Sequence, residues 1–218
     1  MELKSSAKLN IGLHVHNLRS DGFHNISTLF QEINLFDSIK IDEAETFSCK
    51  TSCGNISEAD NFGTKAFKIV KKQNPSIPNV SILINKNIPT NAGLGGGSSN
   101  GTAVLKGLNS FFDLSIDNGN LTSMAQEISS DSTFFIDGGM QFGTQRGEKL
   151  ESVENIEIPK HILLVHPNIK ISTKTAFEQL KNHLLNENMD INLSKLLRVL
   201  KNNTFNSKLF KNDFEMYV

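Results

Sequence analysis

The sequence has 218 residues, of which 38% are hydrophobic and 21% are charged, a composition typical of globular rather than disordered proteins. The formal net charge of −1 gives no electrostatic support for binding nucleic acid or an anionic membrane surface. No apolar run approaches the roughly 20 residues that span a bilayer, and the N-terminal residues lack the apolar core of a signal peptide. We therefore expect a cytoplasmic protein of one large or two small domains.

The first part of the chain predicts a strand, a helix and a second strand. Residues 39–41 alternate between apolar and polar, which is typical of a strand. Apolar residues at helical spacing predict a helix over 62–72, which leads to a turn around 75–78. Residues 80–84 have the apolar pattern of a short buried strand.

Cysteine occurs only at Cys49 and Cys53, with three residues between them. A structural zinc site needs about four ligands, and no histidine stands nearby to complete one. We expect two incidental thiols rather than a metal site, and no disulfide in a reducing compartment.

A glycine-rich segment follows the predicted strand at 80–84 and is the most informative part of the sequence. Four of the five residues from Gly93 to Gly97 are glycine, so the backbone can turn sharply there and approach a ligand closely. Apolar residues at helical spacing follow over 104–112. The glycines therefore stand where a helix begins, and its unpaired N–H groups and dipole favour an anion. Ser98 and Ser99 add hydroxyl donors, so the segment predicts a phosphate-binding loop.

Two better-known phosphate loops do not fit this segment. A Walker A loop needs a lysine after its last glycine, and none follows here. A dinucleotide-binding fingerprint that starts at Gly93 would need a third glycine at the position of Ser98. A flexible linker, or a tight turn that serves only packing, is the alternative. The strand and the amphipathic helix on either side favour the phosphate loop.

The second half of the chain predicts a mixture of helices and strands. Apolar residues over 121–128 predict a helix, and glycines from 138 to 147 predict a β-hairpin that contains residues 140–142. Residues 161–165 have the pattern of a buried strand. Two further helices are predicted by the apolar residues at helical spacing, Phe177, Leu180 and Leu184, then Leu193, Leu196, Leu197 and Leu200. A composition shift near 152–155 predicts domains over 1–155 and 156–218.

Three short segments hold residues that could carry chemistry. Lys8 and Asn10 would share one face of a strand, where they could bind a substrate, although a solvated edge-strand face is favoured from these residues alone. In Asp21-Gly22-Phe23-His24 the Asp-Gly pair predicts a hairpin corner, and the aromatic and imidazole rings could instead bind a flat base. Asp131 is favoured as a helix N-cap, with a general base as the alternative.

These segments together resemble one family of enzymes. The motifs that carry the resemblance stand in this order: Lys8-Leu9-Asn10, Asp21-Gly22-Phe23-His24, Thr28-Leu29-Phe30-Gln31, Pro89 with Gly93 to Asn100, Ser130-Asp131, Gly147-Glu148 and His166-Pro167. The glycine-rich segment alone resembles the GHMP kinase superfamily. The first two motifs narrow the resemblance to the 4-diphosphocytidyl-2-C-methyl-D-erythritol kinases, over nearly the whole chain from residue 7 to about 215.

The resemblance implies a fold and a reaction. The implied fold is α+β: the GHMP kinase fold, with an N-terminal domain like domain 2 of ribosomal protein S5 and an incomplete ferredoxin-like C-terminal domain. The implied reaction transfers the γ-phosphoryl group of ATP to the 2-hydroxyl of the methylerythritol moiety, in the non-mevalonate route to isoprenoid precursors. Small molecules are therefore the expected partners, and Mg²⁺ is expected to arrive with the nucleotide rather than on a protein ligand set.

The resemblance also implies roles for individual residues. Asp131 and Lys8 match the catalytic aspartate and the lysine beside it. The loop around the ATP phosphates is matched by Pro89, Gly93, Leu94, Gly95, Gly96, Gly97, Ser98 and Ser99. The cytidine-binding histidine and aromatic are matched by His24 and Phe23, a second aromatic by Phe177, and a substrate-contacting asparagine by Asn10.

Three departures from the family pattern qualify these expectations. Phe23 stands where the family commonly has tyrosine, which keeps a stacking face and loses a hydroxyl. Ser132 and Thr133 replace a small apolar residue and a proline, which predicts a less rigid local backbone. The family continues beyond 212–215 to a second glycine-rich motif, and the sequence given stops at Val218 before it. We therefore expect either a fragment or a shortened form of the enzyme.

Two other functions stay open. One is another small-molecule kinase of the superfamily, acting on homoserine or a mevalonate-like alcohol, although such substrates offer no base for Phe23 and Phe177 to stack against. The other is a protein that binds a nucleotide without turnover.

Overall fold

The structure is a computed structural model that describes residues 1–54, 56–154, 156, 161–167, 196, 198–200, 202 and 210–217. The chain forms two compact units, each discontinuous in sequence. Unit 1 comprises Met1–Lys8 and Glu32–Gly138, and unit 2 comprises Leu9–Gln31 and Gly139–Val218. Two long strands, β1 (Glu2–Leu18) and β2 (His24–Ala44), contribute residues to both units. The domain bounds 1–155 and 156–218 stay a prediction.

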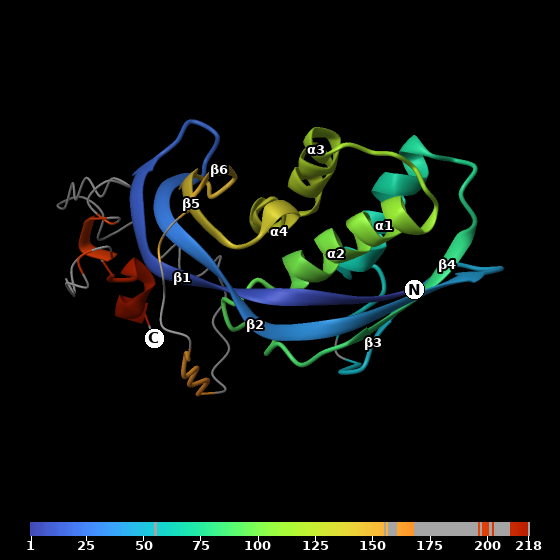
Figure 1. Cartoon of the computed structure of the whole chain (residues 1–218), viewed down its shortest axis with the longest axis horizontal. Coiled ribbons are helices and arrows are strands. Elements are labelled where there is room, and N and C mark those ends of the chain that lie inside the picture. Colours follow the sequence, from blue (N-terminus) through green and yellow to red (C-terminus); the bar gives the residue numbers. More distant parts are fainter. Residues whose placement is uncertain are drawn as a thin grey trace. The chain divides into compact units, whose positions relative to one another are not determined.

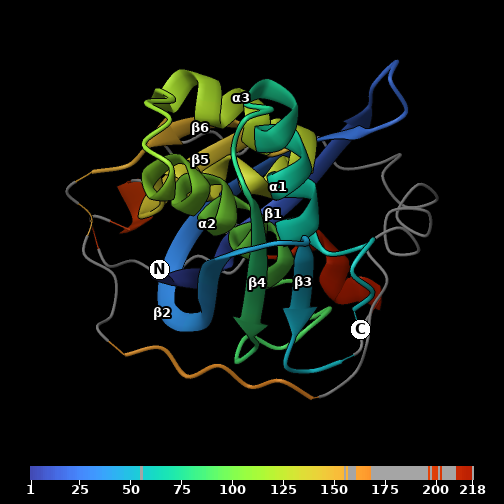
Figure 2. The ribbon, with the colours of Figure 1, turned by 90° about the vertical axis from the view of Figure 1, so that its right-hand side faces the viewer.

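Unit 1 contains a sheet in which β2 is flanked by β1 and β4. Strand β4 (Asn79–Asn85) pairs antiparallel with the second half of β2, and β3 (Ser48–Thr51) pairs parallel with β4. Figure 2 shows β3 and β4 side by side with their arrowheads pointing the same way. Parallel neighbours need a crossover connection, and helix α1 (Phe62–Gln73) lies in the connection between them.

Four helices accompany this sheet. Figure 1 shows α1, α2 (Gly96–Phe111) and α3 (Asn118–Ile128) on one side of the unit 1 parts of β1 and β2. The side chains of Asn61 and Asp117 accept backbone N–H groups and so fix where α1 and α3 begin. The 3₁₀ turn η1 (Ser130–Ser132) and the short helix α4 (Phe134–Asp137) follow α3. Apolar side chains from these helices and from the sheet form the core, including Ile39, Ile41, Val70, Ile82, Ile84, Val104, Leu105, Leu108 and Met124.

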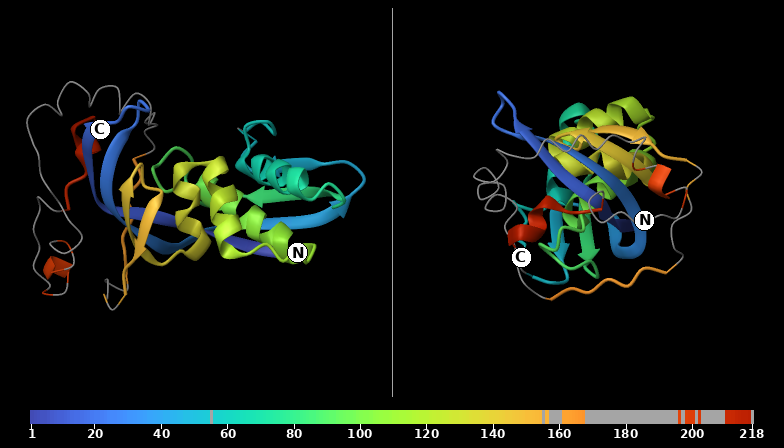
Figure 3. Two further views of the ribbon diagram at one scale, coloured as in Figure 1. Left: turned by 90° about the horizontal axis from the view of Figure 1, so that it is seen from above. Right: turned by 90° about the vertical axis from the view of Figure 1, so that its left-hand side faces the viewer.

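Unit 2 contains the hairpin end of β1 and β2 together with a second hairpin. The first half of β2 pairs antiparallel with β5 (Met140–Gln145), and β5 pairs antiparallel with β6 (Lys149–Ser152). Figure 3 shows the turn that joins β1 to β2 projecting at the end of both strands. The turn η2 (Asp213–Tyr217) is tied to β1, because Asp213 accepts the backbone N–H of Val15 at 2.8 Å.

Most of the elements predicted from the sequence are confirmed. The structure contains the helix expected over 62–72, the strand at 80–84, the helix after the glycine-rich segment, the helix at 121–128 and the hairpin that contains 140–142. Residues 39–41 lie within the long strand β2.

The prediction of a buried strand over 161–165 is wrong. These residues are described and have no regular secondary structure, and Leu163 and Val165 are 89% and 77% exposed. An apolar run reports a tendency to be buried, but a strand also needs a neighbour that supplies backbone hydrogen bonds. No described residue pairs with this segment.

Part of the predicted C-terminal region lies outside the described residues. This applies to Phe177, Leu180, Leu184, Leu193 and Leu197, whereas Leu196 and residues 198–200 are helical. The ferredoxin-like character expected of residues 156–218 falls mostly on this undescribed part. Within the described residues, no helix is both long enough and apolar enough to cross a membrane.

The two cysteines are not joined by a disulfide in the structure. Cys49 is buried on β3, and Cys53 is partly exposed just after it. Burial raises the pKa of the Cys49 thiol to about 11, so this side chain is a packed apolar group at neutral pH.

Candidate active site

The glycine-rich segment leads directly into helix α2 in unit 1. Gly95 is the residue before the helix and has a left-handed backbone with φ of 68°, a conformation that glycine adopts without cost. A Cβ atom added there would lie 3.0 Å from both Lys8 Cγ and Phe135 Cζ. The loop therefore rests directly on these two side chains. No side chain caps the helix, so its first N–H groups stay available to an anion.

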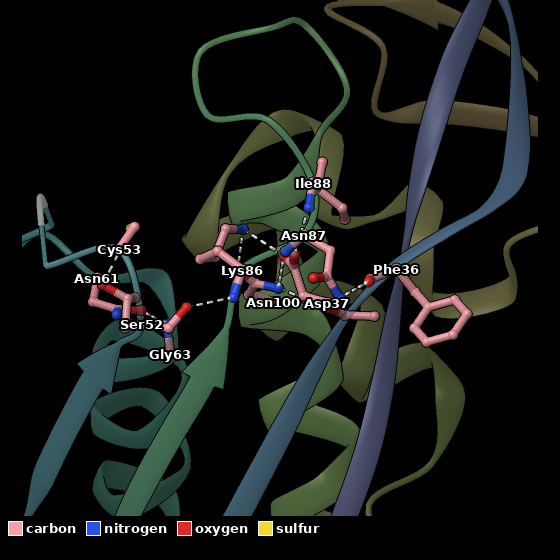
Figure 4. Close-up of polar contacts among 12 residues, drawn as sticks. Phe36, Asp37, Ser52, Cys53, Asn61, Gly63, Lys86, Asn87, Ile88 and Asn100 are labelled. Atoms are coloured by element: carbon pink, nitrogen blue, oxygen red, sulfur yellow. Dashed lines mark hydrogen bonds and ion pairs between the residues drawn. The ribbon is translucent and has the colours of Figure 1, made fainter. Parts of the chain in front are cut away.

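The buried carboxylate of Asp37 accepts hydrogen bonds from residues on both sides of this loop. Figure 4 shows residues from the segment after β4 and from α2 converging on Asp37, which lies on β2 and is fully buried. Its Oδ1 accepts the backbone N–H groups of Asn87 at 2.7 Å and Ile88 at 2.8 Å, just before the loop. Its Oδ2 accepts from the Lys86 ammonium and from Asn100 Nδ2 on α2 at 2.8 Å.

Asn100 completes the buried cluster around Asp37. Its Oδ1 accepts from Lys86 Nζ at 2.9 Å, and its Nδ2 also donates to Ser5 Oγ on β1 at 2.6 Å. The Lys86 ammonium is therefore held between two acceptors and paired with a full counter-charge, which suits it to a structural role rather than to phosphate binding. The sequence analysis did not identify Asp37 or Lys86. The hydrogen-bond partners of Asp37 lie 49 to 63 residues from it in sequence, and no local pattern signals such a cluster.

A second lysine–aspartate pair lies beside the loop. Lys8 Nζ is 3.5 Å from Asp131 Oδ2, and the Lys8 backbone N–H donates to the carbonyl oxygen of Leu94 within the loop at 3.0 Å. The Lys8 side chain is buried, whereas that of Asp131 is 37% exposed. The pair thus has a fixed cation and a carboxylate that solvent or a ligand can reach.

Two predictions made for these residues are wrong. The sequence favours a solvated edge-strand face for Lys8, but the residue is only 5% exposed, and the glycine-rich loop packs against its side chain at Gly95. Asp131 was favoured as a helix N-cap, but it lies inside η1, and Ser129 precedes that turn as its N-cap residue. The catalytic roles of both residues stay predictions.

The predicted hairpin corner is confirmed in unit 2. The Arg19 backbone N–H donates to the carbonyl oxygen of Phe23 at 2.7 Å, which closes the turn between β1 and β2. Asp21 accepts the Phe23 backbone N–H and pairs with the Arg19 guanidinium, and these contacts lower the pKa of the Asp21 carboxyl. The Phe23 side chain is 53% exposed, and the Arg146 guanidinium lies 4.8 Å from its ring centroid. Phe23 therefore offers a rigidly placed aromatic ring at the surface.

His24 and Asn10 are oriented by hydrogen bonds within unit 2. His24 Nδ1 lies 2.9 Å from the carbonyl oxygen of His16. A carbonyl only accepts, so Nδ1 carries the hydrogen and Nε2 is the acceptor of the neutral ring. Asn10 Nδ2 donates to Thr28 Oγ1 at 2.8 Å, and Thr28 donates in turn to a backbone carbonyl. Phe177 lies outside the described residues.

Metal ligands are not evident in the described part of the chain. Within it, no group of three or more His, Cys, Asp and Glu side chains is arranged to hold a metal ion. Two lysine–aspartate pairs, described above, lie beside the glycine-rich loop.

Comparison with known proteins agrees with this geometry. Residues 61–139 match the family model described as GHMP kinases N terminal domain. A 4-diphosphocytidyl-2-C-methyl-D-erythritol kinase of Prochlorococcus marinus (strain MIT 9301) is 36% identical over 230 residues, which cover 100% of this chain and 74% of that protein. The chain belongs to the 4-diphosphocytidyl-2-C-methyl-D-erythritol kinase family.

A further relative and two solved structures support the same family and fold. The 4-diphosphocytidyl-2-C-methyl-D-erythritol kinase of Sulfurihydrogenibium sp. (strain YO3AOP1) is 35% identical, with 88% of this chain and 69% of that protein covered. A crystal structure of 4-(cytidine 5'-diphospho)-2C-methyl-D-erythritol kinase superposes with a TM-score of 0.77 at 24% identity, covering 99% of this chain and 76% of that one. A mevalonate kinase structure superposes with a TM-score of 0.63 at 13% identity.

These findings confirm the resemblance inferred from the sequence. The α+β GHMP kinase fold is confirmed, and the chain is a member of a family of ATP-dependent small-molecule kinases. It spans about three quarters of the length of the Prochlorococcus relative.

Proposed function

We propose that this protein transfers the γ-phosphoryl group of ATP to the 2-hydroxyl of 4-diphosphocytidyl-2-C-methyl-D-erythritol. The observation that carries the proposal is the Lys8–Asp131 pair, which is held against a glycine-rich loop at the start of a helix. The relatives' names support the choice of acceptor.

The phosphates of ATP bind at the loop in this proposal. The unpaired N–H groups at the start of α2 and the hydroxyls of Ser98 and Ser99 donate to phosphate oxygens. Pro89, Leu94 and the glycines from Gly93 to Gly97 shape a backbone that comes close to the ligand. Mg²⁺ arrives with the nucleotide and neutralises charge on the phosphates.

Asp131 and Lys8 carry the chemical step. The Asp131 carboxylate takes the proton of the substrate's 2-hydroxyl while the oxygen of that hydroxyl bonds to the γ-phosphorus of ATP. The bond between the γ-phosphorus and the oxygen that bridges to the β-phosphate breaks, which releases ADP. The Lys8 ammonium stabilises the negative charge that develops on the attacking oxygen. Because Asp131 is partly exposed, it can reach a hydroxyl that enters from solvent.

The cytidine moiety is recognised by residues of unit 2. Phe23 offers the exposed ring on which the cytosine stacks, and Phe177 is the second aromatic of the pair. His24 Nε2, the acceptor nitrogen, receives a hydrogen bond from the exocyclic amino group of the base. Asn10 contacts the substrate through its amide.

ADP release by the protein tests this proposal. The assay contains ATP and Mg²⁺ with the cytidylated substrate, homoserine or mevalonate as the acceptor. We expect turnover only with the cytidylated substrate. Turnover with mevalonate or homoserine instead would assign the protein to another activity of the superfamily. Binding of ATP by folded protein without turnover of any acceptor would contradict the proposal and favour a nucleotide-binding role.

The base contacts are tested by His24→Ala. Loss of the imidazole should raise the KM for the cytidylated substrate about tenfold and leave the KM for ATP within twofold, because one hydrogen bond to the base is removed. Equal changes in both constants would contradict the assignment. His161→Ala, at an exposed histidine, is the matched control.

A further inference from the structure

Three serine hydroxyls connect the start of α2 with the turn that bears Asp131. Ser129 Oγ donates to Ser98 Oγ at 2.8 Å, and Ser129 Oγ lies 2.7 Å from Ser132 Oγ. Ser98 is in the first turn of α2, whereas Ser129 and Ser132 lie on either side of Asp131. All three residues belong to unit 1, and Ser132 is fully buried.

The direction of these hydrogen bonds follows from counting hydrogens. Each hydroxyl carries one hydrogen, and that of Ser129 goes to Ser98. Ser132 Oγ has two possible acceptors, Ser129 Oγ at 2.7 Å and the carbonyl oxygen of Ser98 at 3.4 Å. The shorter contact takes its hydrogen, because Ser129 has none left to donate. Ser98 Oγ is then an acceptor whose own hydrogen meets no further acceptor within the described part of the chain, so it can donate to a ligand at the start of α2. The chain of donors runs from Ser132 through Ser129 to Ser98.

Further hydroxyls fix the backbone of the same turn. Thr102 Oγ1, from α2, donates to the carbonyl oxygen of Ser132 at 2.8 Å. Thr133 Oγ1 donates to the carbonyl oxygen of Ser130 at 3.0 Å. The sequence predicts a less rigid backbone at Ser132 and Thr133, whereas both side chains are buried and used for hydrogen bonding in the structure.

Ser129 is the central member of this arrangement. Its backbone N–H donates to the carbonyl oxygen of Ala125 and ends α3, and its carbonyl oxygen accepts the N–H of Ser132. Its hydroxyl joins the Ser98 and Ser132 side chains, whose residues otherwise share only the longer contact of 3.4 Å from Ser132 Oγ to the carbonyl oxygen of Ser98. Loss of that hydroxyl would free the Ser98 side chain and leave Ser132 with this longer contact, while the backbone of the turn keeps its own bonds.

We propose that the Ser132–Ser129–Ser98 hydroxyl chain is a positioning device. It fixes the turn of Asp131 relative to the start of α2, and it orients the Ser98 hydroxyl as a donor to a phosphate oxygen. The proposal rests on the proposed function, which assigns the phosphates to α2 and the proton transfer to Asp131. Ser129 and Ser132 are positioning residues, because they act through Ser98 and through the backbone of Asp131.

The kinetic experiment compares Ser129→Ala with Ser129→Thr. We expect Ser129→Ala to lower kcat about tenfold and to raise the KM for ATP a few-fold, because misplacement of reacting groups by a fraction of an ångström is costly. The KM for the cytidylated substrate should change less than twofold. Ser129→Thr restores the hydroxyl, and the extended backbone of Ser129 (φ −168°, ψ 164°) with its partial exposure accommodates the extra methyl group, so it should retain near-normal kinetics.

A matched control comes from the same helix. Ser123 is exposed on α3, and its hydroxyl donates back to the carbonyl oxygen of Gly119 at 3.1 Å. Ser123→Ala removes a hydroxyl from α3 without touching the chain, so it should leave kcat and both KM values unchanged. A loss of kcat in Ser123→Ala equal to that in Ser129→Ala would overturn the proposal.

A second measurement does not depend on turnover. Hydrogen exchange of the protein without nucleotide should become several-fold faster in residues 130–138 for Ser129→Ala and stay unchanged in α1. Unchanged exchange in that segment overturns the positioning role, whatever happens to kcat. If the wild-type protein shows no turnover, the proposed function fails, and the exchange result still decides whether the hydroxyl chain holds the turn.

Discussion

Unit 1 contains two lysine–aspartate pairs beside the glycine-rich loop, and they differ in the exposure of the carboxylate. In the Lys86–Asp37 pair both side chains are buried, and Asp37 accepts four hydrogen bonds. In the Lys8–Asp131 pair the lysine is buried and the aspartate is 37% exposed. A fully bonded carboxylate has no lone pair left for a proton, whereas a partly exposed one does. The Lys86–Asp37 pair is therefore suited to stabilising the structure around the loop, and the Lys8–Asp131 pair is suited to proton transfer.

The largest expected effect is on the exposed carboxylate. Asp131→Asn removes the base and keeps the shape, so kcat should fall about 1,000-fold, which corresponds to about 4 kcal/mol of transition-state stabilisation. Steady-state kinetics and ATP binding by calorimetry measure the two effects separately. We expect the Kd for ATP to stay within about threefold. A kcat above a tenth of the wild-type value would contradict the role, and Glu127→Gln, at an exposed acid on α3, is the control.

The buried pair should respond in stability instead. Asp37→Asn leaves the Lys86 ammonium buried without a counter-charge, so the free energy of unfolding should fall by about 3 kcal/mol. Denaturant unfolding measures this change. The double variant Asp37→Asn with Lys86→Met removes the stranded charge and should recover more than half of the loss. If the double variant is less stable than the single variant, charge pairing is not what Asp37 supplies.

Two glycine substitutions test how the loop is supported by Lys8. Gly93 and Gly95 both have a left-handed backbone, so alanine at either position should cost about 1 kcal/mol of stability. A Cβ at Gly93 meets nothing within 4 Å, whereas one at Gly95 meets Lys8 and Phe135 at 3.0 Å. We expect Gly95→Ala alone to displace Lys8, with a fall in kcat several-fold beyond that of Gly93→Ala. Equal kcat values for the two variants would contradict a role of Lys8 in the phosphoryl transfer.

The smallest effect is expected for a third lysine–aspartate pair, which is exposed. Lys40 Nζ lies 3.0 Å from Asp42 Oδ2, closer than Lys8 lies to Asp131, yet both side chains are about half exposed. Solvent screens such a pair, so Lys40→Gln should change the free energy of unfolding by less than about 0.5 kcal/mol and leave kcat unchanged. A change as large as that of Asp37→Asn would mean that distance, rather than burial, decides what these pairs do.

The parts of the site that could be predicted from sequence are those built from neighbouring residues. The loop before α2 was predicted because its glycines, the preceding strand and the following helix adjoin in the chain. The corner at Asp21 was predicted because Asp-Gly determines a turn locally. The roles assigned to Lys8, Asp131 and the cytidine-binding residues came from the family resemblance, and they stay proposals.

The parts that could not be predicted depend on distant contacts. Asp37 has no sequence signal, because its backbone and side-chain partners are contributed by residues 86 to 100. The burial of Lys8 depends on the glycine-rich loop, more than 80 residues away, which contacts it through Leu94 and Gly95. The prediction of a strand over 161–165 is wrong because the apolar pattern is a local feature, whereas a strand also needs a partner strand from elsewhere in the chain. Local patterns predict what a segment prefers, whereas its partners decide what it becomes.

The discontinuity of unit 1 has a consequence for biosynthesis. The contact between Ser5 and Asn100 spans 95 residues, and the N-terminus donates to Ile41 across 40. Strand β1 leaves a ribosome before α2, whose residues emerge only after about a hundred further codons have been translated, several seconds later at ordinary elongation rates. Strand β2 can pair with β1 during that interval, but apolar side chains of β1 that pack against α2, such as Leu3, stay exposed to other nascent chains. Slow formation of such contacts between distant segments makes the yield of folded protein sensitive to temperature and to chaperones. Synthesis at reduced temperature should therefore raise that yield.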